Sequence, residues 1–437
     1  MQKSKFLQKV GDENKAFYYH SLFGNLFLLN REYISVLESS NPLSYKEKDT
    51  ILQDLIDNKY LVDESVDERK ILQQNRQEFL TNLQNGKGVI SLDLNISELC
   101  NFVCPHCMNG CQIGNTKNKL MTWKVAKMAI GEYVKIIKQN GISGEIHFGS
   151  AEPLLNWELI EKVVLYCQNI IPDTQISINT NLSLLTKERA LFFKKHHVFI
   201  ATSLDGPKQG NDLIRIQRKG GTYDAIIQKM KLLQEIEYPL DGCSLTMNDL
   251  NMDFINEDFI LFLKSMGFRG LATDIDLVNN KNCSRDVNFY VDKLISLYKL
   301  CKKIGIENFG SWTAILHNLV NQEEELITYC KAQSGRNLSV NPIGDIFLCG
   351  YSTSRVGNVN KFKQLFSYES EYYKLISLRL PGTQKKCYGC QLEGICSGQC
   401  LVSSEFSSKT NNRVDFLCDF YRKITAQLLE LRLAEEV

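Results

Sequence analysis

Ser97-Glu98-Leu99-Cys100-Asn101-Phe102-Val103-Cys104-Pro105-His106-Cys107 is the stretch that decides the fold. Its cysteines have the spacing CxxxCxxC and follow an apolar alternation over residues 90–96 that predicts a half-buried strand. Three thiolates on one short loop can ligate three irons of a cubane cluster and leave the fourth iron without a protein ligand. A zinc knuckle or three incidental core cysteines are the alternatives, but a zinc knuckle favours CxxC with a further His or Cys pair. The spacing therefore favours an open iron–sulfur cluster.

The composition is that of an ordinary globular protein, apart from its cysteines. The chain has 437 residues, of which 43% are hydrophobic and 23% charged, and its net charge is +1. These values predict two or three domains and give no reason to expect nucleic acid or a membrane as a partner. Because no apolar run reaches membrane-spanning length and no signal core follows Met1, we expect a cytoplasmic protein. Fifteen cysteines in that reducing compartment indicate metal or redox chemistry.

Residues 1–86 contain no cysteine and predict a small unit of their own. Apolar residues at 17–23 and 26–29 flank Gly24-Asn25, which predicts a hairpin with a tight turn. Short helices are expected around 33–37 and over 51–56, and a polar helix over 64–85 would link the unit to the next domain. This order predicts a winged-helix-like unit; a purely structural lid is the alternative.

Residues 87–310 alternate short apolar strands with helical stretches. After the strand that precedes the cysteine loop, strands are predicted over 145–148, 175–179, 198–202, 243–246 and 271–275. Such alternation predicts parallel strands with right-handed crossovers. Six units are too few for a closed eightfold barrel, so we predict an α/β fold with a partial (β/α)6 TIM-like barrel. Its functional groups should lie at the carboxyl ends of the strands.

Small and polar residues follow the carboxyl ends of three of these predicted strands. The second strand is followed by Gly149-Ser150-Ala151-Glu152-Pro153, where small residues allow close approach of a ligand and Glu152 can accept a hydrogen bond from an ammonium group. Asn181 follows the third strand, and Ser203 ends the fourth. Beyond it, Arg215, or else Arg218, could bind a carboxylate in a forked pair. A simple strand-to-helix turn and solvated surface charges are the alternatives.

Cysteines concentrate again in residues 311–437. Cys330 and Cys349 enclose Gly344 and a predicted hairpin over 338–348. A CX2CX5CX3C run and one later cysteine follow, at Cys387, Cys390, Cys396, Cys400 and Cys418. Seven cysteines are too many for one tetrahedral site and nearly enough for two cubane clusters. Two zinc ions or disulfides are the alternatives.

Taken together, these motifs resemble those of radical S-adenosylmethionine (SAM) enzymes with a carboxy-terminal SPASM domain. His106 stands where that family usually has an aromatic residue, and Ser150 and Ala151 stand at the glycines of its Gly-Gly-Glu-Pro motif. The resemblance implies that Cys100, Cys104 and Cys107 hold a 4Fe–4S cluster whose open iron binds SAM. It also implies SAM contacts from Gly149, Ser150, Ala151, Glu152, Asn181, Ser203 and Arg215.

The same resemblance implies two auxiliary 4Fe–4S clusters, which makes three clusters in the chain. Cys387, Cys390, Cys396 and Cys418 would hold one of them, and Cys330, Cys349 and Cys400 the other. Some relatives supply a fourth thiolate to this second cluster shortly after its first cysteine, but no cysteine lies between Cys330 and Cys349. Either that cluster has an open iron, or a distant residue completes it.

The function implied by the resemblance is that of an oxidoreductase that modifies a peptide. An external flavodoxin- or ferredoxin-type reductant would supply the electron that generates a 5′-deoxyadenosyl radical from SAM, and this radical would abstract hydrogen from a side chain. The amino-terminal unit resembles the leader-peptide recognition element of maturases for ribosomally made peptides. The layout is most similar to that of enzymes that form a carbon–carbon crosslink between lysine and tryptophan. A thioether-forming maturase, a formylglycine-forming anaerobic sulfatase-maturing enzyme and a non-enzymatic iron–sulfur electron carrier are the alternatives.

Overall fold

The computed structural model describes residues 1–45, 49–109, 120–240, 242–276, 283–321, 328–410 and 414–436. The six predicted barrel strands are all present, as β6 (Ser91–Leu94), β7 (Glu145–Phe148), β8 (Gln175–Asn179), β9 (Phe199–Ser203), β12 (Gly242–Met247) and β13 (Gly270–Ile275). They are parallel and adjacent in the order β13-β12-β9-β8-β7-β6. The predicted partial barrel is confirmed.

The sheet contains more strands than predicted, with additional strands at both edges. β14 (Glu307–Phe309) adds a parallel strand beside β13, and β15 (Asn337–Val340) adds one beside β6. The predicted hairpin over 338–348 is formed by β15 and β16 (Asp345–Phe347), and β17 (Gly357–Asn358) ends the ten-stranded sheet. The cysteine-rich segment is therefore continuous with the barrel sheet through β15.

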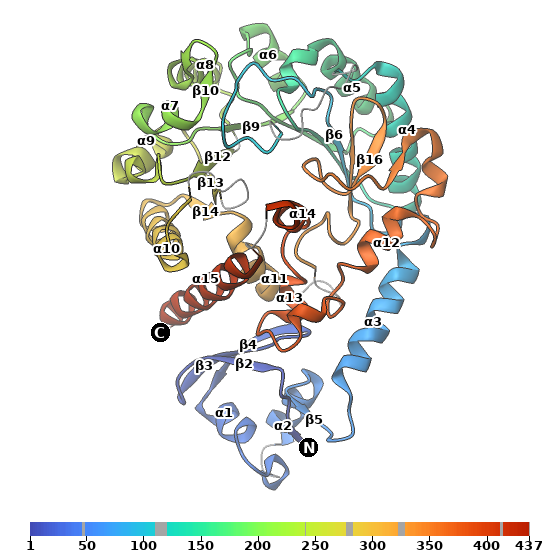
Figure 1. The fold of residues 1–437 in the computed structure, drawn as a ribbon, viewed down its shortest axis with the longest axis vertical. Coiled ribbons are helices and arrows are strands. Elements are labelled where there is room, and N and C mark those ends of the chain that lie inside the picture. Colours follow the sequence, from blue (N-terminus) through green and yellow to red (C-terminus); the bar gives the residue numbers. More distant parts are fainter. Residues whose placement is uncertain are drawn as a thin grey trace.

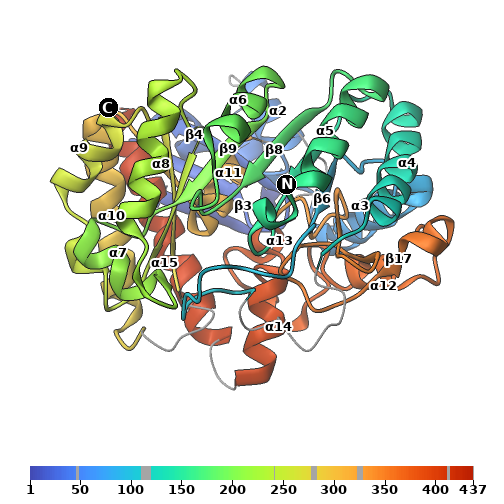
Figure 2. The same cartoon turned by 90° about the horizontal axis from the view of Figure 1, so that it is seen from above.

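Helices cover the outer side of this curved sheet (Figures 1 and 2). They are α4 (Trp123–Asn140), α5 (Trp157–Ile170), α6 (Lys187–Lys195), α7 (Lys208–Ile214), α8 (Tyr223–Glu235), α9 (Glu257–Ser265) and α10 (Val287–Ile304). Alternate strand residues such as Leu92, Ile146 and Ile178 are fully buried in one core with these helices. Their neighbours in sequence on β6 and β7, Asp93 and His147, therefore point to the opposite, polar face.

Local chemistry sets where the long helices begin and end. The side chain of Thr122 caps the first turn of α4, and Asp286 caps α10. Both helices end at a glycine in the left-handed conformation, Gly141 with φ +66° and Gly305 with φ +83°. No helix in the described part of the chain is both long enough and apolar enough to cross a membrane.

The amino-terminal residues form a three-stranded antiparallel sheet with helices at its side. Its strands are β2 (Leu7–Gly11), β3 (Lys15–His20) and β4 (Gly24–Asn30), in that order, and β1 (Gln2–Lys3) pairs separately with β5 (Leu61–Val62). The helices α1 (Arg31–Leu37), α2 (Asp49–Asp57) and α3 (Glu68–Asn82) lie where they were predicted. The strand β2 was not predicted.

The hairpin between β3 and β4 is confirmed, but its predicted turn is wrong. The connection is Ser21–Phe23, and Gly24-Asn25 begins β4. Both of these residues have positive φ, and the pairing register shifts there between Tyr18 and His20. The left-handed pair thus builds a bulge in the strand instead of the turn.

The sheet of β2–β4 is packed on both faces. Ala16 and Tyr18 of β3 belong to a small core with α1 and α2, whereas Phe17 and Tyr19 belong to the main core of the molecule. The remaining helices are α11 (Ala314–Val320), α12 (Glu371–Ser377), α13 (Glu393–Cys396), α14 (Leu401–Thr410) and α15 (Val414–Glu435). Figure 1 shows α14 inside the arc of the large sheet and α15 next to the amino-terminal sheet, which it contacts through β2 and β3.

Candidate active site

A cavity of about 430 Å³ lies at the carboxyl ends of the barrel strands. Cys100, Cys104 and Cys107 line it from the loop after β6. Cys349 and Cys400, from the distant cysteine-rich segment, line the same cavity. Two cysteine motifs that are far apart in the sequence therefore face one space.

The cysteine loop is held by contacts from neighbouring strand ends. Asn181 donates through Nδ2 to Asn101 Oδ1 at 3.0 Å, and the same nitrogen lies 3.8 Å from Cys100 Sγ. Val103 N–H donates to the carbonyl of Ile216 at 2.8 Å. Burial raises the pKa of Cys100 to about 11, so a metal cluster would have to displace a proton from this thiol when it binds.

Five of the predicted SAM-contact residues line the cavity, namely Ser150, Ala151, Asn181, Ser203 and Arg215. Gly149 does not line it; a Cβ at this position would lie 3.0 Å from the ring of His147, so the glycine allows close packing there. The competing arginine, Arg218, is exposed and does not line the cavity.

Glu152 is also absent from the cavity wall. Its carboxylate is fully buried and accepts hydrogen bonds from Thr180 Oγ1 at 2.6 Å, Asn181 N–H at 2.8 Å and Leu154 N–H at 3.0 Å. Burial raises its pKa, although these hydrogen bonds oppose the effect. Glu152 therefore acts on the cavity indirectly, by fixing the turn that carries Asn181.

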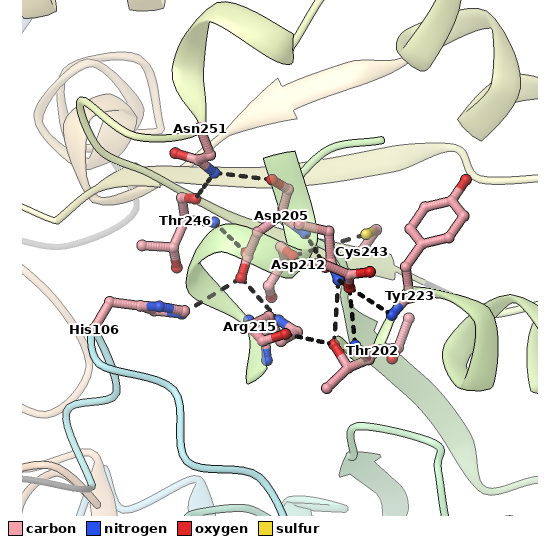
Figure 3. Close-up of polar contacts among 12 residues, drawn as sticks. His106, Thr202, Asp205, Asp212, Arg215, Tyr223, Cys243, Thr246 and Asn251 are labelled. Atoms are coloured by element: carbon pink, nitrogen blue, oxygen red, sulfur yellow. Dashed lines mark hydrogen bonds and ion pairs between the residues drawn. The ribbon is translucent and has the colours of Figure 1, made fainter. Parts of the chain in front are cut away.

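Arg215 is held by an aspartate that was not predicted as a site residue. Asp205 is fully buried, and its Oδ2 accepts from Arg215 Nε at 2.8 Å while His106 Nε2 lies 3.4 Å away (Figure 3). The other oxygen, Oδ1, accepts from Thr246 N–H at 2.8 Å. Burial alone would lower the pKa of Arg215, but the carboxylate outweighs it and keeps the guanidinium charged. Burial lowers the pKa of His106, which favours a neutral ring.

Residues 94–248 match the model of the radical SAM superfamily. The chain has a radical SAM domain. Its matched region includes the cysteine loop and every residue of the Asp205 network described above.

Comparison with known proteins extends this similarity over almost the whole chain. The radical SAM cyclopropyl synthase TigE of Paramaledivibacter caminithermalis is 26% identical, over 98% of this chain and 95% of its own. The solved structure of Streptococcus suis SuiB bound to S-adenosylmethionine has a TM-score of 0.57 at 14% identity and covers 95% of this chain and 98% of SuiB. Native anSMEcpe with bound AdoMet and the Cp18Cys peptide has a TM-score of 0.62 at 17% identity, covering 79% of this chain and 99% of that chain. The radical SAM fold is shared with both structures.

Among the cysteines from Cys330 onward, neighbouring thiols influence one another's pKa. The pKa of Cys396 is raised to about 12 by burial and then by the nearby charges of Cys387, Cys418 and Cys390. Burial likewise raises the pKa of Cys349, and the charges of Cys400, Cys330 and Asp93 add to this effect. The assignment of these cysteines to two auxiliary clusters stays a prediction.

The donor chemistry of all three groups fits iron–sulfur clusters. The fourteen described cysteines are free thiols, and Cys111 lies outside the described residues. Within the described ranges, no three His, Cys, Asp or Glu side chains are close enough to hold a single metal ion. A cubane is larger than one ion and offers a separate iron to each thiolate, so its ligands stand further apart.

Asp274 and Tyr351 are among the cavity residues that were not predicted from the sequence. Asp274 is the penultimate residue of β13, and its Oδ1 accepts from the backbone N–H and hydroxyl of Ser311 at 2.8 and 2.6 Å. Burial raises the pKa of its carboxyl. Tyr351 lines the cavity near Cys349 and Cys107, and 39% of its surface is exposed. The rule that places functional groups at strand ends could have found Asp274, but no motif marks Tyr351.

A second cavity of about 560 Å³ lies in the amino-terminal region. Its wall includes Phe27 and Leu29 of β4 and Asp54 and Leu55 of α2. β4 is an edge strand of its sheet, and Phe27 is 38% exposed. The groove thus combines an open strand edge with an apolar helix face.

Proposed function

We propose that this protein is a radical SAM maturase that forms an intrapeptide carbon–carbon bond in a ribosomally made precursor peptide, with lysine and tryptophan as the joined residues. The observation that carries the proposal is the single cavity shared by Cys100, Cys104 and Cys107 with Cys349 and Cys400. A substrate side chain in that space lies between an initiating site and an oxidising site. The name of TigE, a cyclopropyl synthase, supports carbon–carbon bond formation by this architecture.

The chain fits three 4Fe–4S clusters with SAM as cosubstrate. When bound, these groups supply the electron that cleaves SAM, the radical that abstracts hydrogen and the acceptor for the electron released afterwards. Around them, Asn181 and Ser203 offer hydrogen bonds to the cosubstrate, and Arg215 offers a fixed positive charge to its carboxylate. An external one-electron reductant completes the system.

Asp274 is a cavity residue that is suited to take up a proton. Joining two carbons that each carry hydrogen releases one hydrogen atom, which the radical takes, and then one proton and one electron. Ser311 holds Asp274 at Oδ1, and the side chain lines the cavity. A half-buried carboxylate with a raised pKa at the cavity wall is a suitable base for this proton, which it would accept at Oδ2.

In this proposal residues 1–86 recognise the leader of the precursor, residues 87–310 carry the barrel and residues 311–437 the auxiliary clusters. The leader would add a strand to β4 and pack its side chains against α2 in the amino-terminal groove. Deleting the unit is a poor test, because Phe17, Tyr19 and Leu22 belong to the main core.

A point variant in the groove tests leader recognition instead. We expect Phe27→Ala to weaken leader binding about tenfold, because it removes a partly exposed ring from the groove wall. Leu191→Ala is the matched control, since Leu191 is 46% exposed on the far helix α6. The measurement is the dissociation constant of a labelled leader peptide, and equal values for both variants would reject the groove as its site.

The overall function is tested with the reduced, cluster-loaded protein, SAM and a candidate precursor peptide. The expected result is 5′-deoxyadenosine together with a peptide that has lost two hydrogens and gives no fragment ions between the joined residues. Absence of 5′-deoxyadenosine with intact clusters would reject the enzyme. A product that reacts with a hydrazide would instead indicate oxidation of a side chain to formylglycine.

A further inference from the structure

The group Cys330, Cys349 and Cys400 has one thiolate fewer than a cubane has irons. Four other described cysteines, Cys167, Cys243, Cys283 and Cys301, are buried in the main hydrophobic core and unsuited to supply the missing ligand. Among the described residues, a fourth ligand would therefore have to be a residue other than cysteine. The following inference rests on the proposed auxiliary cluster.

We propose that the carboxylate of Asp93 is the fourth ligand of this cluster. Asp93 lies in the middle of β6 and points to the polar face of the sheet, where β15 brings Ser339 opposite it. Asn337 of β15 donates through Nδ2 to Asp93 Oδ2 at 2.8 Å and to the carbonyl of Leu348 at 2.9 Å. A single amide thus joins the carboxylate to the residue that precedes Cys349.

The backbone after Cys349 packs on the same polar face. A Cβ at Gly350 would lie 3.1 Å from the side chain of Asn95 and 3.4 Å from Ser339 Oγ. Asn95 follows Asp93 by two residues, so its side chain points to the same side of the sheet. The glycine lets the Cys349 segment approach β6 closely.

Cys330 also lies near the polar face of the sheet. Cys330 and Asp93 line one cavity of about 470 Å³, together with His147 and Ser177. Asp93 is thereby placed between the segments that carry two of the three thiolates.

Other polar groups in this cavity are already engaged. Glu145 forms a salt bridge with Lys331 at 3.0 Å, and His147 Nδ1 lies 2.9 Å from Ser177 Oγ. Asp93 forms no salt bridge with any lysine or arginine in the described ranges. One of its oxygens can stay with Asn337 while the other binds iron.

An aspartate ligand would close the cluster to small molecules and make it an electron acceptor rather than a substrate-binding site. The test uses the full-length chain with Cys100, Cys104 and Cys107 replaced by alanine, so that only auxiliary clusters remain. About eight irons per chain are expected in this background, and about four or fewer would reject the auxiliary clusters themselves. That outcome is distinct from a failure of the Asp93 assignment.

Cyanide is the probe, and the electron paramagnetic resonance spectrum of the reduced clusters is the readout. We expect no change on adding cyanide to the background protein, a changed spectrum with Asp93→Ala, and restored insensitivity with Asp93→Cys. Glu145→Ala, in the same cavity, is the matched control and should stay insensitive. If the Asp93→Ala protein does not assemble clusters, the same spectra are recorded for Asp93→Asn, which keeps the side-chain shape. The same change with cyanide is then expected.

Two results would overturn the assignment. A background protein that already responds to cyanide has an open iron. An alanine or asparagine variant that has unchanged spectra with and without cyanide does not use Asp93 as a ligand.

Discussion

Asp274 gives the site a pH dependence whose sign follows from its burial. Because burial raises its pKa, the carboxylate form needed as a base grows only as the pH rises through that raised value. We expect the ratio of crosslinked product to 5′-deoxyadenosine to rise with pH in that window. Asp274→Asn should lower the ratio about 100-fold and abolish its pH dependence, as expected for loss of a general base.

Liquid chromatography of both products in one reaction measures that ratio. Asp276→Asn is the matched control, since Asp276 also lines the cavity. A product ratio for Asp274→Asn that equals the ratio for the parent protein at every pH would contradict the role of Asp274.

Glu152 is expected to stabilise the site rather than to contact SAM. Its Oε2 accepts from Asn181 N–H, so the amide nitrogen of a glutamine placed there would face another donor. We expect Glu152→Gln to cost about 1–3 kcal/mol of stability, because buried donors lose their acceptor. The apparent melting temperature measures the loss, and Glu158→Gln, at an exposed position, is the control. Equal melting temperatures for the two variants would argue against this role.

The positions of some site residues could be predicted from the sequence, and those of others could not. The position after a strand placed Cys100 and Ser203 at the cavity, because strand-end residues of parallel strands meet there. The family resemblance placed Arg215, which directly follows α7, at the same cavity. The direction of the Glu152 side chain depends on donors from the next strand, which spacing does not reveal. At Ser150, which stands at a glycine of the Gly-Gly-Glu-Pro motif, φ is +80°. The backbone there has positive φ although the residue is not glycine.

At the level of elements, one bidentate ion pair connects the amino-terminal region to the cysteine-rich segment. Arg69 of α3 donates through Nη1 and Nη2 to the two carboxylate oxygens of Glu393 in α13, at 2.5 and 2.9 Å. The guanidinium also lies over the ring of Tyr388, 4.2 Å from its centroid. Glu393 is fully buried and accepts from Gly389 N–H, between Cys387 and Cys390. The pair therefore supports a predicted cluster loop.

Arg69→Met should leave that buried carboxylate unpaired. We expect a loss of about 2–3 kcal/mol, less than for a fully buried pair because Arg69 is one-third exposed. Arg69→Lys should recover part of the loss, since lysine keeps the charge but not the forked geometry. Melting temperature and iron content are the measurements. Arg422→Met removes an exposed pair with Asp419 and serves as the control, and a matching loss there would contradict the prediction.

Element prediction succeeded where the pattern was local. Six barrel strands and the helices α1 to α3 were found from periodicity alone. The parallel pairing of β15 with β6 was missed, because it joins a four-residue strand to a partner about 240 residues earlier. The bulge at Gly24-Asn25 was missed for a similar reason, since turn residues can also build a bulge.

For the whole molecule, iron content tests the assignment of ten cysteines at once. About twelve irons per chain are expected from three cubanes. Cys396→Ala should lower this number by about four, because we assign Cys396 to one cluster only. Cys301→Ala, in the buried face of α10, should keep all the iron. Equal iron in both variants would contradict the cluster at Cys387, Cys390, Cys396 and Cys418.

The pairing of β15 with β6 also has a consequence for how the protein is made in the cell. Asn337, which bonds to Ser91 across this pair, is translated 246 residues after it. At typical elongation rates this interval lasts roughly 10–50 s. During that time one edge of β6 has no partner, and the nearby thiols of the nascent chain lie beside an incomplete sheet. Metal loading is therefore expected to follow release from the ribosome, and oxygen exposure in that interval is expected to be the most damaging.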